Sequence, residues 1–283
     1  RLLSRGLGDV YKRQDNIRAV YNQFGPDNSA ADSNSGHGTH ITGIIVGNGT
    51  LDNQTLGIAP AAEVNFYQIE YDTSGLLARW GTLYSMFSHS LQNQARTHTN
   101  AWGSVNQPGQ YTADSHSADS FIVDQPAYLA IFSGGDIGQN QGATTTPPGT
   151  AKNVLTIGAS TTGMGGTDPQ GSVWSNNSGG TLDGRVKPDL VAPGVEICSA
   201  RASEATSVAG SDCSTAIDQD ATPLYVTGTG SSMATAVASG AALIVREYLG
   251  QELGLTEPDA SLVKAMLINL SLIHISEPTR QKP

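Results

Sequence analysis

The sequence has few basic residues, few cysteines and no long apolar run. Lysine and arginine together number 15 against 25 aspartate and glutamate residues, and the formal net charge is −10. This balance disfavours a polyanionic partner, so we predict that the protein binds no nucleic acid. No run approaches the roughly 20 apolar residues of a membrane span, and we predict no membrane partner. The acidic surface is compatible with bound cations or with an acidic, saline or extracellular setting.

The only two cysteines are Cys198 and Cys213, which lie in a Ser-, Ala- and Asp-rich stretch typical of a surface loop. A disulfide closing a loop of about 15 residues would contribute roughly 3 kcal/mol on the chain-entropy model. Two reduced thiols are the alternative. A bridge would place the protein in an oxidising compartment, and we predict a secreted, extracellular protein.

The two ends of the chain are related to each other through their coding sequences. One set of codons for Ser4–Gln14 has a reverse complement that encodes Leu270–Arg280 residue for residue. The shared sequence resembles a transposon-end adapter used in sequencing libraries. Residues 1–14 and 270–283 are therefore interpreted as adapter-like artefacts; a basic arm and a C-terminal tail are the alternative. Residues 15–269 are then expected to be one partial catalytic domain, truncated at both ends.

Apolar runs alternate between strand-like and helix-like patterns along residues 15–269. Strands are predicted at Val64–Ile69, Leu129–Phe132, Val154–Ile157 and Leu190–Ala192, with the end of another within Asp15–Tyr21. Helices are predicted near Ile41–Ile45, over Leu76–Arg96, over Ser115–Val123 and over Val237–Leu249. The alternation predicts an α/β fold whose parallel sheet is covered by helices on both faces. Functional sites of such folds lie beyond the carboxyl ends of the strands.

Two Gly-flanked turns carry the side chains of greatest chemical interest. His37 lies in Gly36-His37-Gly38-Thr39-His40, and Ser232 lies in Gly230-Ser231-Ser232-Met233, each at the start of an apolar helix. A hydroxyl next to an imidazole base is the arrangement that nucleophilic acyl transfer requires. A serine at a helix start is also a common N-cap, so the residues alone leave both readings open.

Five motifs, in order along the chain, resemble those of the subtilisin-like serine proteases, the subtilases. They are Gly36–His40 with Gly43, Asn100–Gly103, Gly149–Asn153, Asp183–Asp189 with Ala192–Gly194, and Gly230–Thr235. The resemblance covers nearly all of residues 15–269 and is greatest to the large secreted bacterial branch. It implies a subtilisin-like fold and endopeptidase activity on protein or peptide substrates, with Ser232 as nucleophile and His37 as general base. It also implies that substrate binds along Asn100, Ala101, Trp102, Gly103, Gly134 and Gly135.

The orienting aspartate of the family has no counterpart here. In the family it lies in an Asp-Ser/Thr-Gly turn some thirty to forty residues before the histidine, which falls before Asp15 in this chain. Asp27 and Asp32 are too close to His37 in sequence to end a neighbouring strand, and we expect both in a loop. The chain is therefore expected to be nearly inactive. A catalytically inactive subtilase-like binding or structural protein is the alternative, and a sedolisin-type acid peptidase is disfavoured because it would have glutamate in place of His37.

A second departure lies at Phe132–Gly138, which resembles the family's Phe-Ala-Ala-Gly-Asn-Glu-Gly segment. It puts Asp136 at the oxyanion-hole position, where the family has asparagine. An ionised carboxylate can only accept hydrogen bonds, whereas a protonated one retains a donor. We therefore expect an intact enzyme to work best at acidic pH; a compensating donor or a dead homologue is the alternative.

The remaining titratable residues carry weaker signals. His40 could pair with His37 on a metal, but no further ligands accompany them, and we predict no metal there. His89, His98 and His116 are expected to be surface residues. The acidic stretch Asp212–Asp220 is interpreted as a solvated loop, with a structural calcium ion as the alternative. We predict a monomer that requires no cofactor.

Overall fold

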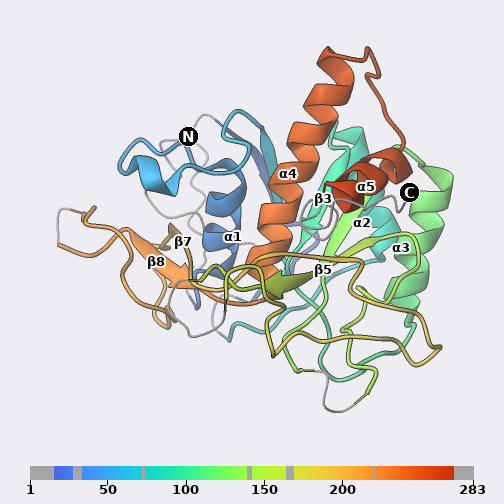
Figure 1. The fold of residues 1–283 in the computed structure, drawn as a ribbon, viewed down its shortest axis with the longest axis horizontal. Helices are drawn as coiled ribbons and strands as arrows, with labels where there is room; N and C mark the ends of the chain where they lie inside the picture. Colours follow the sequence, from blue (N-terminus) through green and yellow to red (C-terminus); the bar gives the residue numbers. More distant parts are fainter. Residues whose placement is uncertain are drawn as a thin grey trace, which may run out of the picture.

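Parallel strands form two separate sheets at the centre of the molecule. The structure, a computed structural model, describes residues 16–27, 34–71, 74–138, 142–163, 169–218 and 221–270. Residues 1–14 and 271–283 lie outside these ranges, so the adapter interpretation stays a prediction. Asp32 and the last two residues of the acidic stretch 212–220 also lie outside them. Helices pack on both sides of the larger sheet (Figure 1).

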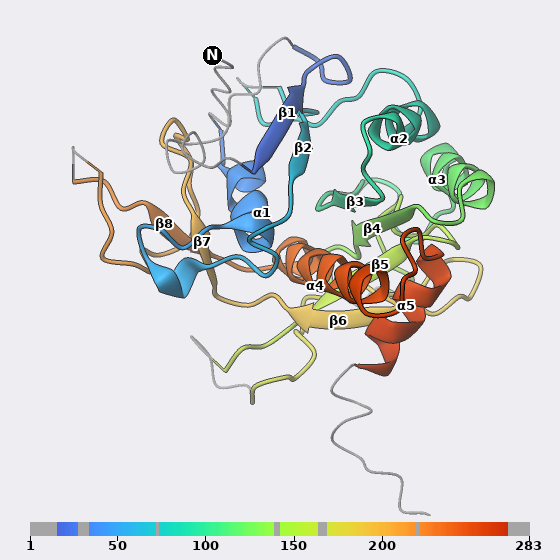
Figure 2. The same ribbon diagram turned by 90° about the horizontal axis from the view of Figure 1, so that it is seen from above.

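The smaller sheet pairs β1 (Ile17–Tyr21) with β2 (Val64–Tyr67) in parallel. The larger sheet has the order β3-β4-β5-β6 and is also parallel throughout. Its strands are β3 (Thr97–Asn100), β4 (Leu129–Ser133), β5 (Leu155–Ser160) and β6 (Leu190–Pro193). A separate antiparallel hairpin joins β7 (Ile197–Ala200) to β8 (Tyr225–Gly228). Strands β2 and β3 face each other without pairing (Figure 2).

Five α-helices and one short 3₁₀ helix complete the described part of the chain. They are α1 (His37–Val46), η1 (Asn53–Thr55), α2 (Leu83–Gln92), α3 (Ala113–Asp124), α4 (Ser231–Gln251) and α5 (Ala260–Asn269). Helices α2 and α3 cover one face of the larger sheet, and α4 and α5 cover the other. The predicted α/β fold with a parallel sheet covered on both faces is confirmed. No helix within the described ranges is long and apolar enough to cross a membrane.

The alternation of side chains along β4 explains the two layers. Leu129 and Ile131 are fully buried and pack with α4 and α5, while Ala130 and Phe132 are fully buried and pack with α2 and α3. Successive strand residues point to opposite faces, so a strand covered by helices on both faces is continuously apolar. The apolar run that predicted a strand here therefore also places it at the centre of the sheet.

The predicted helix over residues 76–96 was too long at its start. Helix α2 begins only at Leu83, because Thr82 caps it: the Thr82 hydroxyl accepts from Ser85 N, and the Ser85 hydroxyl contacts Thr82 N in return. Trp80, which fits the apolar spacing of the predicted helix, is 63% exposed and lies before α2. A capping box of this kind fixes a helix start more strongly than apolar spacing does.

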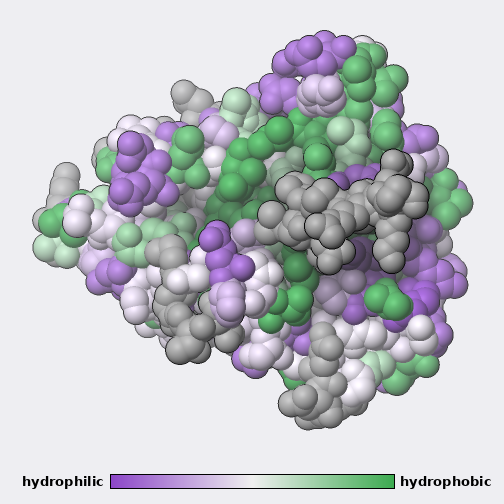
Figure 3. Space-filling model, in the orientation of Figure 1, coloured by the Kyte–Doolittle hydropathy of each residue, from purple (hydrophilic) through white to green (hydrophobic). Residues whose placement is uncertain are grey.

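The expectation that His98 lies on the surface was also wrong. It belongs to β3, is only 8% exposed, and stacks near Phe87 and Tyr67, with ring centroids 4.9 Å and 5.5 Å away. By contrast, part of the predicted apolar helix α4 is open to solvent. Its first turns are buried, but Ile244 is 47% exposed, and Figure 3 shows an apolar strip over α4.

Candidate active site

His37 is the first residue of α1, and the backbone before it needs glycine. Gly36 has φ 74°, in the left-handed region that favours glycine, and a Cβ there would lie 3.2 Å from Cβ of Ala202. The helix behind His37 is held by Ile41, Ile44 and Ile45, which are buried against β1, β2 and α4. The half-buried imidazole is thus presented from a rigid helix at the carboxyl end of the strands.

Ser232 lies in the first turn of α4, after Gly230 with φ 151°. The half-buried Ser232 hydroxyl donates a hydrogen bond of 3.1 Å to the carbonyl of Ala101, just after the end of β3. No hydrogen bond joins the Ser232 hydroxyl to the ring of His37; both residues lie in the described part of the chain. The hydroxyl therefore lies beside the chain segment that follows β3, and attack on a substrate would require it to turn towards the imidazole.

Asp136 binds the start of α4 directly, a contact that sequence reasoning missed. The Ser231 N–H donates to Oδ1 of Asp136 at 2.8 Å, and the N–H of Gly135 donates to the Ser231 hydroxyl at 3.1 Å. A Cβ on Gly230 would lie 2.6 Å from Oδ2 of Asp136, so glycine is required there. A carboxylate at a helix N-terminus is favoured by the partial positive charge of the free N–H groups. The carboxylate thus caps the helix that carries Ser232.

The same carboxylate influences His37. Burial lowers the pKa of His37 below its usual value of 6.5, and the negative charge of Asp136 opposes that shift. Burial is the larger of the two effects, so the ring is neutral at pH 7. A neutral imidazole can accept a proton, which a general base must do.

The side chains of Asn100 and Trp102, two residues predicted to bind substrate, are packed into the protein. The Asn100 side chain is buried and turned into the sheet, where its Nδ2 donates to the carbonyls of His98 and Ile131, both at 3.3 Å. The Trp102 ring packs edge-on against Phe132 at 5.8 Å. Only the backbone of Asn100, and not its amide, remains available to a ligand.

The glycines of the predicted substrate-binding segments are required by close packing. A Cβ on Gly103 would collide with the Thr146 side chain, and one on Gly135 would lie 2.6 Å from Cγ2 of Thr146. Gly134 N donates to the carbonyl of Ile157 at 2.8 Å, which ties this loop to β5. Thr146 is therefore held between the two segments that flank Ser232.

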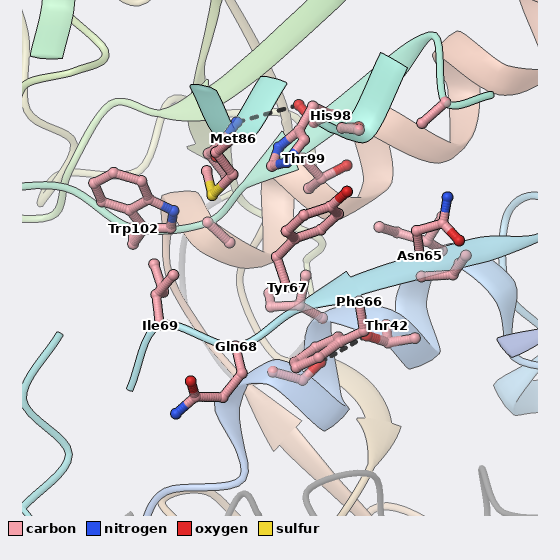
Figure 4. A pocket seen from close by; sticks show the side chains of 18 of the residues that line it. Thr42, Asn65, Phe66, Tyr67, Gln68, Ile69, Met86, His98, Thr99 and Trp102 are labelled. Carbon is pink, nitrogen blue, oxygen red and sulfur yellow. Dashed lines mark hydrogen bonds between the residues drawn. The ribbon is translucent and has the colours of Figure 1, made fainter. Parts of the chain in front are cut away.

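A cavity of about 560 Å³ separates β2 from β3. Val64–Glu70 and Thr97–Gly103 line it from the two strands and the residues that follow them, and His37 is also part of the lining. Figure 4 shows Tyr67 and Thr99 on opposite walls. Nothing in the composition or periodicity of the sequence indicates this cavity, because it arises from strand order.

Asp27 does not orient His37 in the structure. It lies in a bend after β1, as expected for a loop residue, and accepts a hydrogen bond from Nε2 of Gln68 at 3.0 Å. Asp136 is the charged group that acts on the pKa of His37. Within the described ranges, the site thus contains a serine hydroxyl and an imidazole but no carboxylate in the position of the family's orienting aspartate.

The His40 ring is buried and hydrogen-bonded to β8. Its Nε2–H donates to the carbonyl of Val226 at 3.0 Å, and burial lowers its pKa to about 4. In the described part of the chain, no three His, Cys, Asp or Glu side chains gather to hold a metal ion. His40 is therefore a structural residue that ties α1 to β8.

The two cysteines form a disulfide in the structure, with an S–S distance of 2.01 Å. Cys198 belongs to β7, so the bridge fastens the long β7–β8 connection to its own hairpin. That connection touches the segment before His37, because Ser207 N donates to the carbonyl of Asn34 at 2.8 Å. The bridge thus helps to fix the backbone that leads to His37.

The comparison with known families agrees with this geometry. The model of the subtilase family, Peptidase_S8, matches residues 3–279, and the chain belongs to the subtilase family. Among solved structures, the prenylagaramide maturation protease PagA is similar over 93% of this chain and 78% of the PagA chain, with a TM-score of 0.63 and 20% identity. A cold-adapted subtilisin-like serine proteinase is similar over 94% of this chain and 77% of the proteinase chain, with a TM-score of 0.60 and 20% identity. These likenesses show the fold.

Relatives by sequence are longer proteins. The serine protease/ABC transporter B family protein tagA of Dictyostelium discoideum is 28% identical over 86% of this chain, which spans 19% of that protein. Subtilisin-like protease 5 of Arthroderma otae is 29% identical over 68% of this chain, which spans 43% of that protein. The chain thus spans less than half the length of these relatives.

Proposed function

We propose that this chain is the catalytic region of a serine endopeptidase of subtilisin type, with Ser232 as nucleophile and His37 as general base. The observation that carries the proposal is the convergence of two helix starts at one end of the strands. The Ser232 hydroxyl meets the Ala101 carbonyl at 3.1 Å, and Asp136, which binds the residue before Ser232, also acts on His37. Family membership supports the same assignment.

The proposed reaction begins with rotation of the Ser232 hydroxyl from Ala101 towards the neutral imidazole of His37. The imidazole takes the hydroxyl proton as the oxygen attacks the scissile carbonyl, and it then gives the proton to the leaving amine. Water hydrolyses the resulting ester on Ser232 in a second, equivalent step. The N–H of Ser231 is held by Asp136, so the N–H of Ser232, at the positive end of α4, is the backbone donor proposed to stabilise the oxyanion.

The arrangement around His37 also supports a second candidate, a subtilase-like binding protein without activity. Among the residues that the structure describes, no carboxylate takes the orienting position, and the serine hydroxyl bonds to Ala101 instead of the base. Loss of the orienting aspartate lowers the rate by about 10⁴-fold in another serine protease fold. We therefore expect this chain alone to be nearly inactive.

Asp136 supports a pH-dependent form of the first candidate. Its ionised carboxylate holds the N–H of Ser231 and offers no donor to an oxyanion. Protonation would weaken that hydrogen bond and supply an O–H donor in the same place. Losing one such donor in a subtilisin costs about 2.7–4 kcal/mol of transition-state stabilisation. We propose that the active form is the one with Asp136 protonated.

The setting of the enzyme follows from the same proposal. Protein or peptide chains would be its substrates, and the disulfide suits an extracellular, secreted protein. We propose that it acts as a monomer without a required cofactor, with any calcium serving a structural role.

An active-serine phosphonate tests the assignment of the nucleophile. The protein should become labelled on Ser232, slowly at neutral pH and faster at mildly acidic pH, and the label should be located by peptide mass mapping. Ser232→Ala should abolish labelling, whereas Ser231→Ala should retain it, because Ser231 is buried and bonded to Gly135. Labelling that persists in Ser232→Ala would refute the nucleophile, and no labelling at any pH would favour the inactive candidate.

A further inference from the structure

The segment between α1 and β2 carries a pattern that the proposed function does not use. Asparagine, then any residue except proline, then serine or threonine, is the acceptor pattern for an N-linked glycan. The sequence has this pattern at four places, which begin at Asn48, Asn53, Asn176 and Asn269. The last of them overlaps residues 270–283, which are interpreted as adapter, so three places remain.

Asn48-Gly49-Thr50 forms a turn directly after α1, on the side of the molecule away from α3 (Figures 1 and 2). Oδ1 of Asn48 accepts a hydrogen bond from the Thr50 N–H at 3.1 Å, and Gly49 has φ 64°, in the left-handed region. Asn48 and Thr50 are both exposed. Within the described part of the chain, the Asn48 amide nitrogen and the Thr50 hydroxyl form no hydrogen bond. The nitrogen that would receive a sugar is therefore accessible.

The other two patterns are partly enclosed by the fold. Thr55, the third residue of the Asn53 pattern, is buried, and its hydroxyl donates to a backbone carbonyl at 2.7 Å. Ser178, the third residue of the Asn176 pattern, is also buried, and its hydroxyl accepts from a backbone N–H at 3.2 Å. A transferase must recognise the third residue as well as the asparagine. Asn48 can therefore be modified before or after folding, and the other two only before it.

Exposed apolar side chains lie beside this turn. Leu51 and Leu56 are 48% and 53% exposed, and Leu56 lies opposite Asn48 in an isolated antiparallel bridge. Ile58 is 38% exposed and packs against α4, where a Cβ on Gly240 would lie 2.4 Å from Cβ of Ile58. We call these three side chains the α1–β2 patch. Apolar side chains that gather on one surface are typical of a region that something covers.

We propose that Asn48 carries an N-linked glycan in the secreted protein and that this glycan shields the α1–β2 patch. The proposal rests on the proposed secretion and not on peptidase activity. Asn48 follows the last turn of α1, whereas His37 begins that helix, so the two lie about 15 Å apart at 1.5 Å per residue. The glycan would therefore leave the candidate active site open.

The proposed transfer is a substitution at a sugar carbon. The amide nitrogen of Asn48 forms a bond to the anomeric carbon of a lipid-diphosphate oligosaccharide, while the bond from that carbon to the diphosphate oxygen breaks. The lipid diphosphate leaves with the electron pair, and the amide nitrogen loses one proton. The step needs no oxidant or reductant, and the side chain remains an uncharged amide.

Site mapping of the secreted chain tests the proposal. The full chain is expressed behind a secretory signal in eukaryotic cells, and its glycans are removed by peptide-N-glycosidase in water labelled with heavy oxygen. Removal converts a glycosylated asparagine to aspartate that contains one heavy oxygen, and mass spectrometry locates it. A sample incubated without glycosidase corrects for spontaneous deamidation of Asn48-Gly49. We expect the heavy label on Asn48, and an unlabelled Asn48 would overturn the proposal.

Substitutions at Thr50 give a matched pair of variants. Thr50→Ser keeps the pattern and should keep the label on Asn48, whereas Thr50→Ala should lower it about tenfold or more. Thr50 is exposed and contributes only its backbone N–H to the turn, so both variants should fold. A label that persists in Thr50→Ala would show that Asn48 is modified by some other chemistry.

Transfer to the finished fold tests the role of exposure. Unglycosylated protein, either folded or cut into peptides, is incubated with a single-subunit oligosaccharyl transferase and a lipid-linked sugar. The peptides should accept sugar at all three asparagines. The folded chain should accept it on Asn48 about tenfold more than on Asn53 or Asn176, because their patterns have a buried third residue. Equal transfer to the three in the folded chain would contradict the structural argument.

An apolar dye and the active-serine phosphonate separate this proposal from the proposed function. Removal of the glycan should increase the fluorescence of bound anilinonaphthalene sulfonate, and the same treatment of Asn48→Gln should not. Unchanged fluorescence would refute shielding of the α1–β2 patch. Phosphonate labelling of Ser232 should be equal with and without the glycan. If Ser232 is labelled in neither form while Asn48 is glycosylated, the glycan site stands and the peptidase assignment fails.

Discussion

Acid should destabilise this protein through two buried imidazoles. His40 and His98 are 4% and 8% exposed, and burial lowers the pKa of each from 6.5 to about 4. In the unfolded chain both rings take up a proton near pH 6.5, whereas in the folded protein they resist it. The unfolded state therefore binds more protons between about pH 6.5 and 4, and the stability falls as the pH is lowered through that window.

The size of the effect follows from the shift. A depression of about 2.5 pKa units corresponds to about 3 kcal/mol for each ring once the pH is below both values. At pH 5, where the folded rings are still neutral, the loss is about 2 kcal/mol each relative to pH 8. Two rings together would remove about 4 kcal/mol, a large part of the 5–15 kcal/mol that is typical of a domain.

Urea unfolding at pH 8, 6 and 5 measures this loss, and His98→Phe tests its cause. The phenyl ring keeps the contacts with Phe87 and Tyr128, and the only interaction of the ring nitrogens that it removes is a weak one with the Asn100 side chain, which raises the pKa of His98 against the larger effect of burial. The variant should lose about 2 kcal/mol less than the parent between pH 8 and 5. His116→Gln is the control on an exposed histidine and should follow the parent.

An equal unfolding free energy of the parent at pH 8 and pH 5 would contradict the predicted effect of the two imidazoles. Parallel losses of stability in His98→Phe and in the parent would contradict it for His98. If Asp136 has its proposed role, activity would rise as the pH falls, while stability would decrease. The two trends would confine the enzyme to a narrow, mildly acidic pH range.

Three further predictions concern single features. Asp136→Asn should restore a permanent donor, raise neutral-pH labelling or hydrolysis about 10²-fold and flatten the pH–rate profile; an unchanged profile would remove Asp136 from the mechanism. Replacing Cys198 and Cys213 together by serine should lower the free energy of unfolding by about 3 kcal/mol, and a reducing agent should then have no further effect on urea unfolding. Phe87→Ala, at a fully buried side chain, should cost about 3–5 kcal/mol, whereas Trp80→Ala, at a residue 63% exposed, should change the unfolding midpoint little.

The elements that sequence patterns predicted well are those whose signal is local. The apolar run at β4 and the Gly-flanked starts of α1 and α4 carry their structure within a few residues, and the structure has them at the expected places. The predicted start of α2 came too early in the sequence because Trp80 fits the apolar spacing. The observed start is set by the capping box of Thr82 and Ser85. Here a local signal was present, and the capping box could have corrected the boundary.

Other features depend on contacts between distant segments. His98 stands among polar residues in Thr97–Asn100, so nothing in the sequence marks it as buried; its burial comes from α2 and β4. The hydrogen bond from Ser231 to Asp136 joins residues 95 positions apart. The family motif identified the importance of Asp136, but only the fold shows that its carboxylate caps α4.

The division into two sheets also governs how the molecule opens. No strand pairing in the described ranges connects β1 and β2 to the larger sheet, and a two-stranded sheet is marginal by itself. Its stability comes from packing of Ile17, Val20, Val64 and Phe66 against α1. Amide hydrogens of β2 should therefore exchange with solvent through local unfolding that leaves β4 and β5 protected. Such an opening would loosen the support of His37, the proposed base, while Ser232, the proposed nucleophile, stayed in place.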